Sequence, residues 1–95
     1  MTKAKTQNTP DMTPLIFAVS ELSTVLRETC MSVSAGGRIV SWIDDTPDGY
    51  HISIALDDSG ELKAELQLWM VDPVRMYAVI GFCHQNCAST SIEML

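Results

Sequence analysis

Two stretches of alternating polar and apolar residues constrain the fold of this chain more than any other feature. In residues 50–56, YHISIAL, apolar side chains recur at every second position, and the same period governs residues 62–70, LKAELQLWM. A period of two indicates a β-strand with one buried face, because successive side chains point to opposite sides. The turn sequence DDSG at 57–60 separates the stretches, so together they predict an antiparallel hairpin.

The alternation also divides the side chains of this hairpin between two faces. The side chains predicted to point inward are Tyr50, Ile52, Ile54, Leu56, Leu62, Ala64, Leu66, Leu68 and Met70. Those predicted to point outward are His51, Ser53, Ala55, Lys63, Glu65, Gln67 and Trp69. Residues 61–70 also contain good helix formers, so a helix is the alternative for this stretch. The unbroken period of two favours a strand.

A third strand is predicted just before this hairpin. Residues 38–43, RIVSWI, are followed by DDTPDG at 44–49, which is a strong turn signal. The three strands therefore form a predicted antiparallel meander. In the first strand Val40 and Trp42 share one face, and Ile39 and Ile43 share the other, so the sequence leaves open which pair points inward.

Two helices flank the predicted strands. Thr13-Pro14 is typical of a helix start, and Ser34-Ala35-Gly36-Gly37 is typical of a helix end. Asp72-Pro73 repeats the start signal for a second, largely buried helix that extends to about residue 87. The apolar positions recur at helical spacing: Leu15, Ala18, Val19, Leu22, Val25, Leu26 and Cys30 in the first helix, and Met76, Tyr77, Ile80, Cys83 and Cys87 in the second.

The expected fold class is α+β, in the order α-β-β-β-α. A three-stranded antiparallel meander with one apolar face would carry both helices on that face, which gives two layers. Residues 1–12 are expected to be a flexible leader, and residues 13–95 a single domain. The tail, residues 88–95, is expected either to add a last short strand or to pack against the domain.

This element order resembles that of double-stranded-RNA-binding domains. The resemblance concerns the order of elements only, and those domains hold RNA with basic residues near their second helix. In this chain the second helix carries Arg75 alone. We therefore do not extend RNA binding to this protein.

The charge of the chain argues against nucleic acid as a partner. The formal net charge of the 95 residues is −6. Lys3 and Lys5 are two of six basic residues and Asp11 is one of twelve acidic ones, so four basic residues face eleven acidic ones beyond residue 11. Such a surface repels phosphate and suits a basic protein partner. The sequence shows no apolar run of about 18 residues and no secretory signal, so neither membrane insertion nor export is expected.

The three cysteines predict a cytoplasmic protein with free thiols, because their number is odd and no export signal precedes them. Cys83 and Cys87 lie four residues apart, on the same face of the second helix, around His84. We expect no metal and no cofactor, since buried cysteine commonly behaves as a small apolar residue. The alternative is a small zinc or thiol-redox protein that uses Cys30, Cys83 and Cys87.

The sequence predicts no catalytic site. His51 and His84 are the two histidines, and neither lies in a recognisable nucleophile motif. The acidic residues at 44–48 and 57–61 lack the ligand spacing of a calcium loop, and Gly36-Gly37 lacks the lysine of a phosphate loop. The protein is therefore expected not to be an enzyme.

The outer face of the predicted sheet is the expected binding surface. It carries Trp69 with an apolar pair from the first strand, and exposed apolar surface containing tryptophan usually marks an interface. The predicted partner-binding residues are Trp69, Gln67, Lys63, Ala55, His51 and Trp42. Three occupants are considered: a second copy in a homodimer, a different protein, or the C-terminal tail folded across the face.

These observations favour a small acidic protein-interaction module without catalytic activity. Inhibitors, immunity proteins and adaptors, such as those that phages and plasmids encode, have this size and charge. We expect a homodimer through the outer sheet face, acting on another protein. The sequence does not identify that protein.

Overall fold

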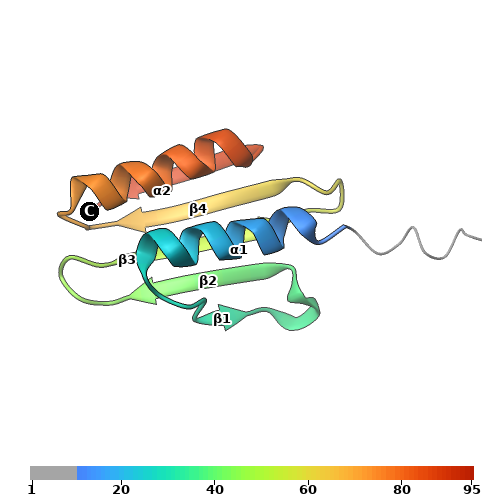
Figure 1. Ribbon diagram of the computed structural model, residues 1–95, viewed down its shortest axis with the longest axis horizontal. Helices are drawn as coiled ribbons and strands as arrows, with labels where there is room; N and C mark the ends of the chain where they lie inside the picture. The colour runs from blue at the N-terminus through green and yellow to red at the C-terminus, as the bar shows by residue number, and fades with distance from the viewer. Residues whose placement is uncertain (1–10) are drawn as a thin grey trace, which may run out of the picture.

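The computed structural model describes residues 11–95 as two helices packed on one face of a five-stranded sheet (Figure 1). The first ten residues of the predicted leader lie outside the described residues. The elements follow the order α1 (Thr13–Leu26), β1 (Ser32–Val33), the 3₁₀ turn η2 (Ala35–Gly37), β2 (Ile39–Asp44), β3 (Tyr50–Leu56), β4 (Leu62–Leu68), α2 (Pro73–Asn86) and β5 (Ser89–Met94).

The sheet is larger than predicted and is mixed rather than purely antiparallel. Its strand order is β1-β2-β3-β4-β5. The three predicted strands are present as β2, β3 and β4, and they pair antiparallel with Trp42 opposite Ile52 and Ile52 opposite Leu66. β1 adds an antiparallel edge next to β2, and β5 adds a parallel edge next to β4. The order of elements therefore no longer matches the α-β-β-β-α order of double-stranded-RNA-binding domains.

The first helix ends earlier than predicted. Asp11 accepts a hydrogen bond from the Thr13 N–H at the helix start, while Met12 is the N-cap residue and its side chain makes no capping bond. Arg27 then adopts the left-handed conformation, with φ of 59°, and its N–H donates to the Ser23 carbonyl. The chain turns at this point, and Ser32 pairs with β2 instead of continuing the helix. The prediction that Cys30 lies on this helix is therefore wrong.

The second helix begins where the sequence predicts. The Asp72 carboxylate accepts hydrogen bonds from the N–H groups of Val74 at 3.0 Å and Arg75 at 3.2 Å. Such a cap satisfies amides that have no partner within the helix. The helix is less buried than expected, because Val74 is 78% exposed and Tyr77 is 70% exposed. Tyr77 therefore does not belong to the core face, contrary to the prediction.

The core lies between the helices and the inner face of the sheet. Its fully buried members come from α1, β2, β3, β4 and α2: Leu22, Leu26, Trp42, Tyr50, Ile52, Ile54, Leu66, Leu68, Val79 and Cys83. The alternation in β3 and β4 thus assigns the inner face correctly. Each buried aliphatic or aromatic side chain stabilises the fold by about 1.5–3 kcal/mol through removal from water.

The C-terminal tail forms the edge strand β5 and leaves the outer face of the sheet open. Ala88 donates its N–H to Leu62, and the register of β5 on β4 runs from Lys63 opposite Ser89 to Leu68 opposite Met94. Because α2 returns the chain to the other end of the sheet, β5 can pair only in parallel with β4. The tail therefore does not cover the outer face.

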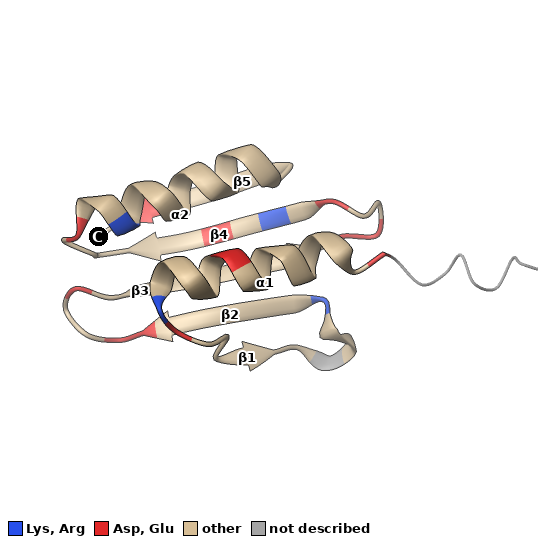
Figure 2. Cartoon of the chain, viewed as in Figure 1, with Lys and Arg blue, Asp and Glu red and all other residues tan. Residues whose placement is uncertain are grey.

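Acidic side chains gather at the turns at both ends of the strands (Figure 2). At one turn Arg38 and Asp58 form an ion pair of 2.9 Å, and Lys63 lies 3.9 Å from Asp57. No helix among residues 11–95 has the length and apolar character that crossing a bilayer requires.

Candidate partner-binding face

The outer face of the sheet is built from the alternate residues of four strands. We call this surface the outer face. It comprises Ile39, Ser41 and Ile43 of β2, His51, Ser53 and Ala55 of β3, Lys63, Glu65 and Gln67 of β4, and Ser89, Ser91 and Glu93 of β5. The strand register aligns these residues in three rows that cross the sheet.

The middle row is polar and mostly short. It runs from Ser41 through Ser53 and Glu65 to Ser91. The hydroxyl groups of Ser41 and Ser53 are 3.0 Å apart and hydrogen-bonded. On one side lies a row of longer side chains, namely Ile43, His51, Gln67 and Glu93. This difference in side-chain length hollows the surface between the rows.

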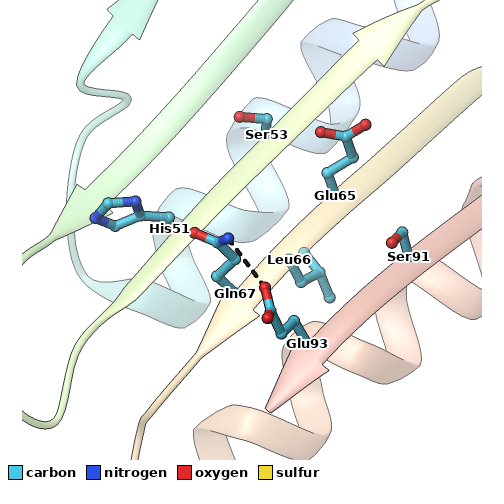
Figure 3. Close-up of a pocket in the computed structure, with 7 residues that line it drawn as sticks. All are labelled: His51, Ser53, Glu65, Leu66, Gln67, Ser91 and Glu93. Carbon is cyan, nitrogen blue, oxygen red and sulfur yellow. Dashed lines mark hydrogen bonds between the residues drawn. The ribbon is translucent and has the colours of Figure 1, made fainter. Parts of the chain in front are cut away.

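The hollow is an open groove of about 430 Å³ over β3, β4 and β5 (Figure 3). Gln67 and Glu93 stand on one side of it, and Ser53, Glu65 and Ser91 lie opposite them (Figure 3). The full lining is His51, Ser53, Glu65, Leu66, Gln67, Ser91 and Glu93. Its volume is enough for a side chain or two of a partner, and it lies toward the lower end of the range of about 300–1,000 Å³ that is usual for small-molecule sites.

Two carboxylates give the groove a negative charge. The Gln67 amide donates to the Glu93 carboxylate at 3.1 Å, which holds Glu93 beside the groove (Figure 3). Within residues 11–95, no hydrogen bond or ion pair involves the carboxylate of Glu65. A groove lined by an unpaired carboxylate and a second carboxylate is a favourable site for a cationic side chain, because hydrogen bonds between charged groups are stronger than neutral ones.

His51 is fixed at one end of the groove. Its Nε2 lies 2.6 Å from the Asp45 carboxylate, and its ring centroid lies 5.2 Å from that of Trp69, with the planes tilted by 47°. The imidazole points away from Ser53 (Figure 3). Ser53 is instead bonded to Ser41. His51, Asp45 and Ser53 therefore do not form a serine-type triad.

The turn between β2 and β3 positions both Asp45 and Trp69. Gly49 is buried in this turn, and a Cβ atom there would lie 1.8 Å from the Asp44 carbonyl oxygen. The Gly49 carbonyl accepts the backbone N–H of Trp69 at 3.1 Å. Only glycine lets the turn close this tightly, and the closed turn ties Trp69, which follows the end of β4, to the side of His51.

The structure shows where the residues of the predicted binding set lie. His51 and Gln67 line the groove, and Trp69 lies against His51. Ala55 and Lys63 lie in the outer row on the other side of the serines. The remaining member of the set requires a correction: Trp42 is 1% exposed, and its Nε1 donates to the Ser23 hydroxyl at 3.2 Å inside the core. Ile39 and Ile43 are the β2 pair on the outer face, with exposures of 44% and 39%.

Sequence reasoning missed the β5 residues of the groove. Ser91 and Glu93 line it only because β5 pairs with β4, and that pairing was not predicted. The signal was present in residues 89–94, STSIEM, where Ser89, Ser91 and Glu93 alternate with Thr90, Ile92 and Met94. Glu65 and Ser53 were placed on the outer face but were not recognised as parts of a groove.

The three cysteines do not form one site. Cys30 donates a hydrogen bond to the Ser32 carbonyl near β1, whereas Cys83 and Cys87 belong to the end of α2. No cluster of three histidine, cysteine, aspartate or glutamate side chains within residues 11–95 could hold a metal ion. The hydrogen bond between the thiols of Cys83 and Cys87 raises the pKa of Cys83, which burial raises further. The same hydrogen bond lowers the pKa of Cys87, against the opposing effect of burial. Cys87, which is half-buried, is therefore the more acidic thiol of this pair.

Comparisons with protein-family models, with curated proteins and with solved structures return no match for this chain. The functional argument therefore rests on the geometry of the outer face.

Proposed function

We propose that this protein is a small acidic protein-interaction module that acts by binding, without catalysis, and that its outer face is the binding surface. The roles of inhibitor, immunity protein and adaptor all fit this proposal. The observation that carries it is the groove beside Gln67, where the unpaired carboxylate of Glu65 and the carboxylate of Glu93 line opposite sides, on a face that residues 11–95 leave open.

The chemistry of the groove favours a basic protein segment as its occupant. An arginine or lysine side chain would meet Glu65 and Glu93 in the groove, and the rings of His51 and Trp69 offer a flat surface beside it. Serine hydroxyl groups in the middle row can bond to the partner's backbone. The net charge of −6 would also attract such a partner over a distance of about 8 Å at physiological salt.

A homodimer through the outer face is the other occupant proposed for this surface. Ile39 and Ile43 supply exposed apolar area for it at the β2 end. The middle of the face is less suitable for self-association, because two copies packed face to face would bring Glu65 and Glu93 close to the same carboxylates of the partner subunit. Like charges that are desolvated together oppose binding, so the basic partner is the occupant that we favour.

Site-directed photocrosslinking tests this proposal. A photoreactive amino acid would replace Gln67 in one variant and Glu21, which is exposed on α1 behind the sheet, in a matched control. Both variants would be irradiated in an extract of the native host, and adducts would be identified by mass spectrometry. We expect a basic protein to be crosslinked from position 67 and not from position 21. Equal adducts from both positions, adducts of this chain with itself, or none from position 67 would contradict the proposed occupant.

A further inference from the structure

The two edges of the sheet differ in how well they are protected. β1 has two residues, and the loop that contains η2 follows it, whereas β5 has six residues in an unbroken register with β4. Within residues 11–95, no strand lies on the outer side of β5. An edge strand offers unpaired N–H and C=O groups, and proteins usually protect such an edge with lysine, proline or a bulge. Residues 89–94 contain no lysine or proline, and their pairing shows no bulge.

The direction of the free backbone groups follows from the pairing. The Leu95 N–H, at the end of β5, points to β4, where it donates to the Leu68 carbonyl at 2.8 Å. Backbone groups of successive strand residues point to alternate sides. The backbone groups of Ser91 and Glu93 therefore also point to β4, and the N–H and C=O groups of Thr90, Ile92 and Met94 point outward, in the plane of the sheet. These residues can accept another strand without any change in β5.

Exposed apolar side chains accompany this edge. Met94 and Leu95 are 55% and 66% exposed, and Tyr77 of α2 is 70% exposed. α2 lies over the β5 side of the sheet (Figure 1), and its Phe82 faces α1, where the ring centroid lies 5.8 Å from that of Phe17. Tyr77 is five residues before Phe82, which is about 140° around the helix at 100° per residue. Its ring therefore points away from α1, on the side of the open edge.

We propose that β5 pairs with β5 of a second copy of this chain, antiparallel about a two-fold axis, to form one continuous ten-stranded sheet. A second copy fits better than a separate extended peptide, because the two-fold axis brings the α2 helices of both subunits side by side. The Tyr77 side of each α2 then faces the partner subunit, and the same surface of both subunits meets, which is the self-complementarity of an isologous interface. A peptide would satisfy the backbone groups of β5 and leave Tyr77 exposed.

The charges of β5 are compatible with this pairing. Directly opposite residues of an antiparallel pair lie on the same face, so a symmetric register must be centred on a residue. With Ile92 at the centre, Ser91 lies opposite Glu93 of the partner subunit, and Thr90 lies opposite Met94 of the partner subunit. No two carboxylates face each other in this register. In the dimer, the grooves of the two subunits would lie on one extended outer face. Formation of this dimer does not depend on the proposed binding of a basic partner.

Sedimentation equilibrium of the full chain tests the pairing. We expect the wild type to sediment at twice the 10.5 kDa chain mass, with a dimer that tightens as salt screens the charges of the two subunits. Thr90→Pro removes an outward N–H at an edge position where proline is tolerated. It is expected to raise the dimer Kd at least roughly tenfold, while Thr90→Ala leaves it within about twofold. Circular dichroism would verify that both variants fold.

A charge series keeps the test decisive if the proline variant does not fold. Ser91→Asp would face Glu93 of the partner subunit and weaken the dimer, whereas Ser91→Lys would face the same carboxylate and tighten it. Ser20→Asp, on the exposed side of α1, adds the same charge as Ser91→Asp at a distant position and is expected to have no effect. A monomeric wild type, or a dimer that is insensitive to all substitutions at positions 90 and 91, would overturn the proposal.

Discussion

In strands β3 and β4, every inward-facing side chain is apolar or aromatic and at most 3% exposed, whereas five of the six outward-facing side chains, all except Ala55, are polar. Both sets of side chains alternate along the same backbone. The inner face is specified by burial against the helices, and no acidic or basic side chain of residues 11–95 is fully buried. The outer face has no such constraint, and its serines, carboxylates and His51 form a groove that the fold itself does not require.

The two tryptophans provide the largest expected contrast between the faces. Trp42→Ala is expected to reduce the free energy of unfolding by about 4 kcal/mol, because it leaves a cavity in the core. Trp69→Ala, which removes a half-buried ring that contacts His51, is expected to cost about 1 kcal/mol. Urea denaturation followed by circular dichroism measures both values. Trp42→Phe serves as a milder substitution if the alanine variant is unfolded.

Equal losses for the two alanine variants would contradict this assignment of faces. A loss at position 69 larger than that at position 42 would show that the indole of Trp69 belongs to the core, and would remove the basis for an outer binding surface.

A smaller effect is expected at the exposed turn between β3 and β4. The Ser59 hydroxyl and the backbone N–H groups of Glu61 and Ser59 donate to the Asp57 carboxylate, and these hydrogen bonds lower the pKa of Asp57 below its ordinary value of 3.8. Because the folded-state pKa is the lower one, folding favours the ionised form. Its stabilisation is present above about pH 4 and is lost as the pH falls through the folded-state pKa.

Asp57→Asn removes this titration and tests its sign. Melting temperatures measured between pH 6 and pH 2.5 are expected to fall less steeply below pH 4 for the variant than for the wild type. Asp58→Asn, at an exposed neighbour that pairs with Arg38, is the comparison variant at the same turn. A wild type whose stability rises below pH 4 would contradict the expected direction.

The alternation of side chains made much of the sheet predictable. The bounds of β3 agree with the prediction, and β2 and β4 begin or end within two residues of it. A strand with one buried face alternates apolar and polar residues along its own sequence, so it can be predicted without knowing which strands lie beside it. The same holds for the start of α2, because Asp72 caps the helix through local hydrogen bonds.

The features that the sequence left open or misplaced depend on distant contacts. β5 exists as part of the sheet because it pairs with β4 after the α2 crossover, and the bond from Gln67 to Glu93 spans 26 residues. The end of α1 was misplaced because Cys30 continues the apolar spacing of the helix beyond Arg27, where the backbone leaves the helix to supply β1. The groove was not predicted because one of its sides belongs to β5, and the pairing of β5 with β4 was not predicted.

The most direct test of the account is the binding of a basic peptide to the groove. Isothermal titration with a short peptide of alternating arginine and serine would compare Glu65→Gln with Glu21→Gln, which changes the net charge equally on α1. We expect Glu65→Gln to raise the Kd roughly fivefold to tenfold, through loss of a charge-assisted hydrogen bond, and Glu21→Gln to change it less than about twofold. Equal changes in both variants, or no measurable binding by the wild type, would contradict a binding site for basic segments on the outer face.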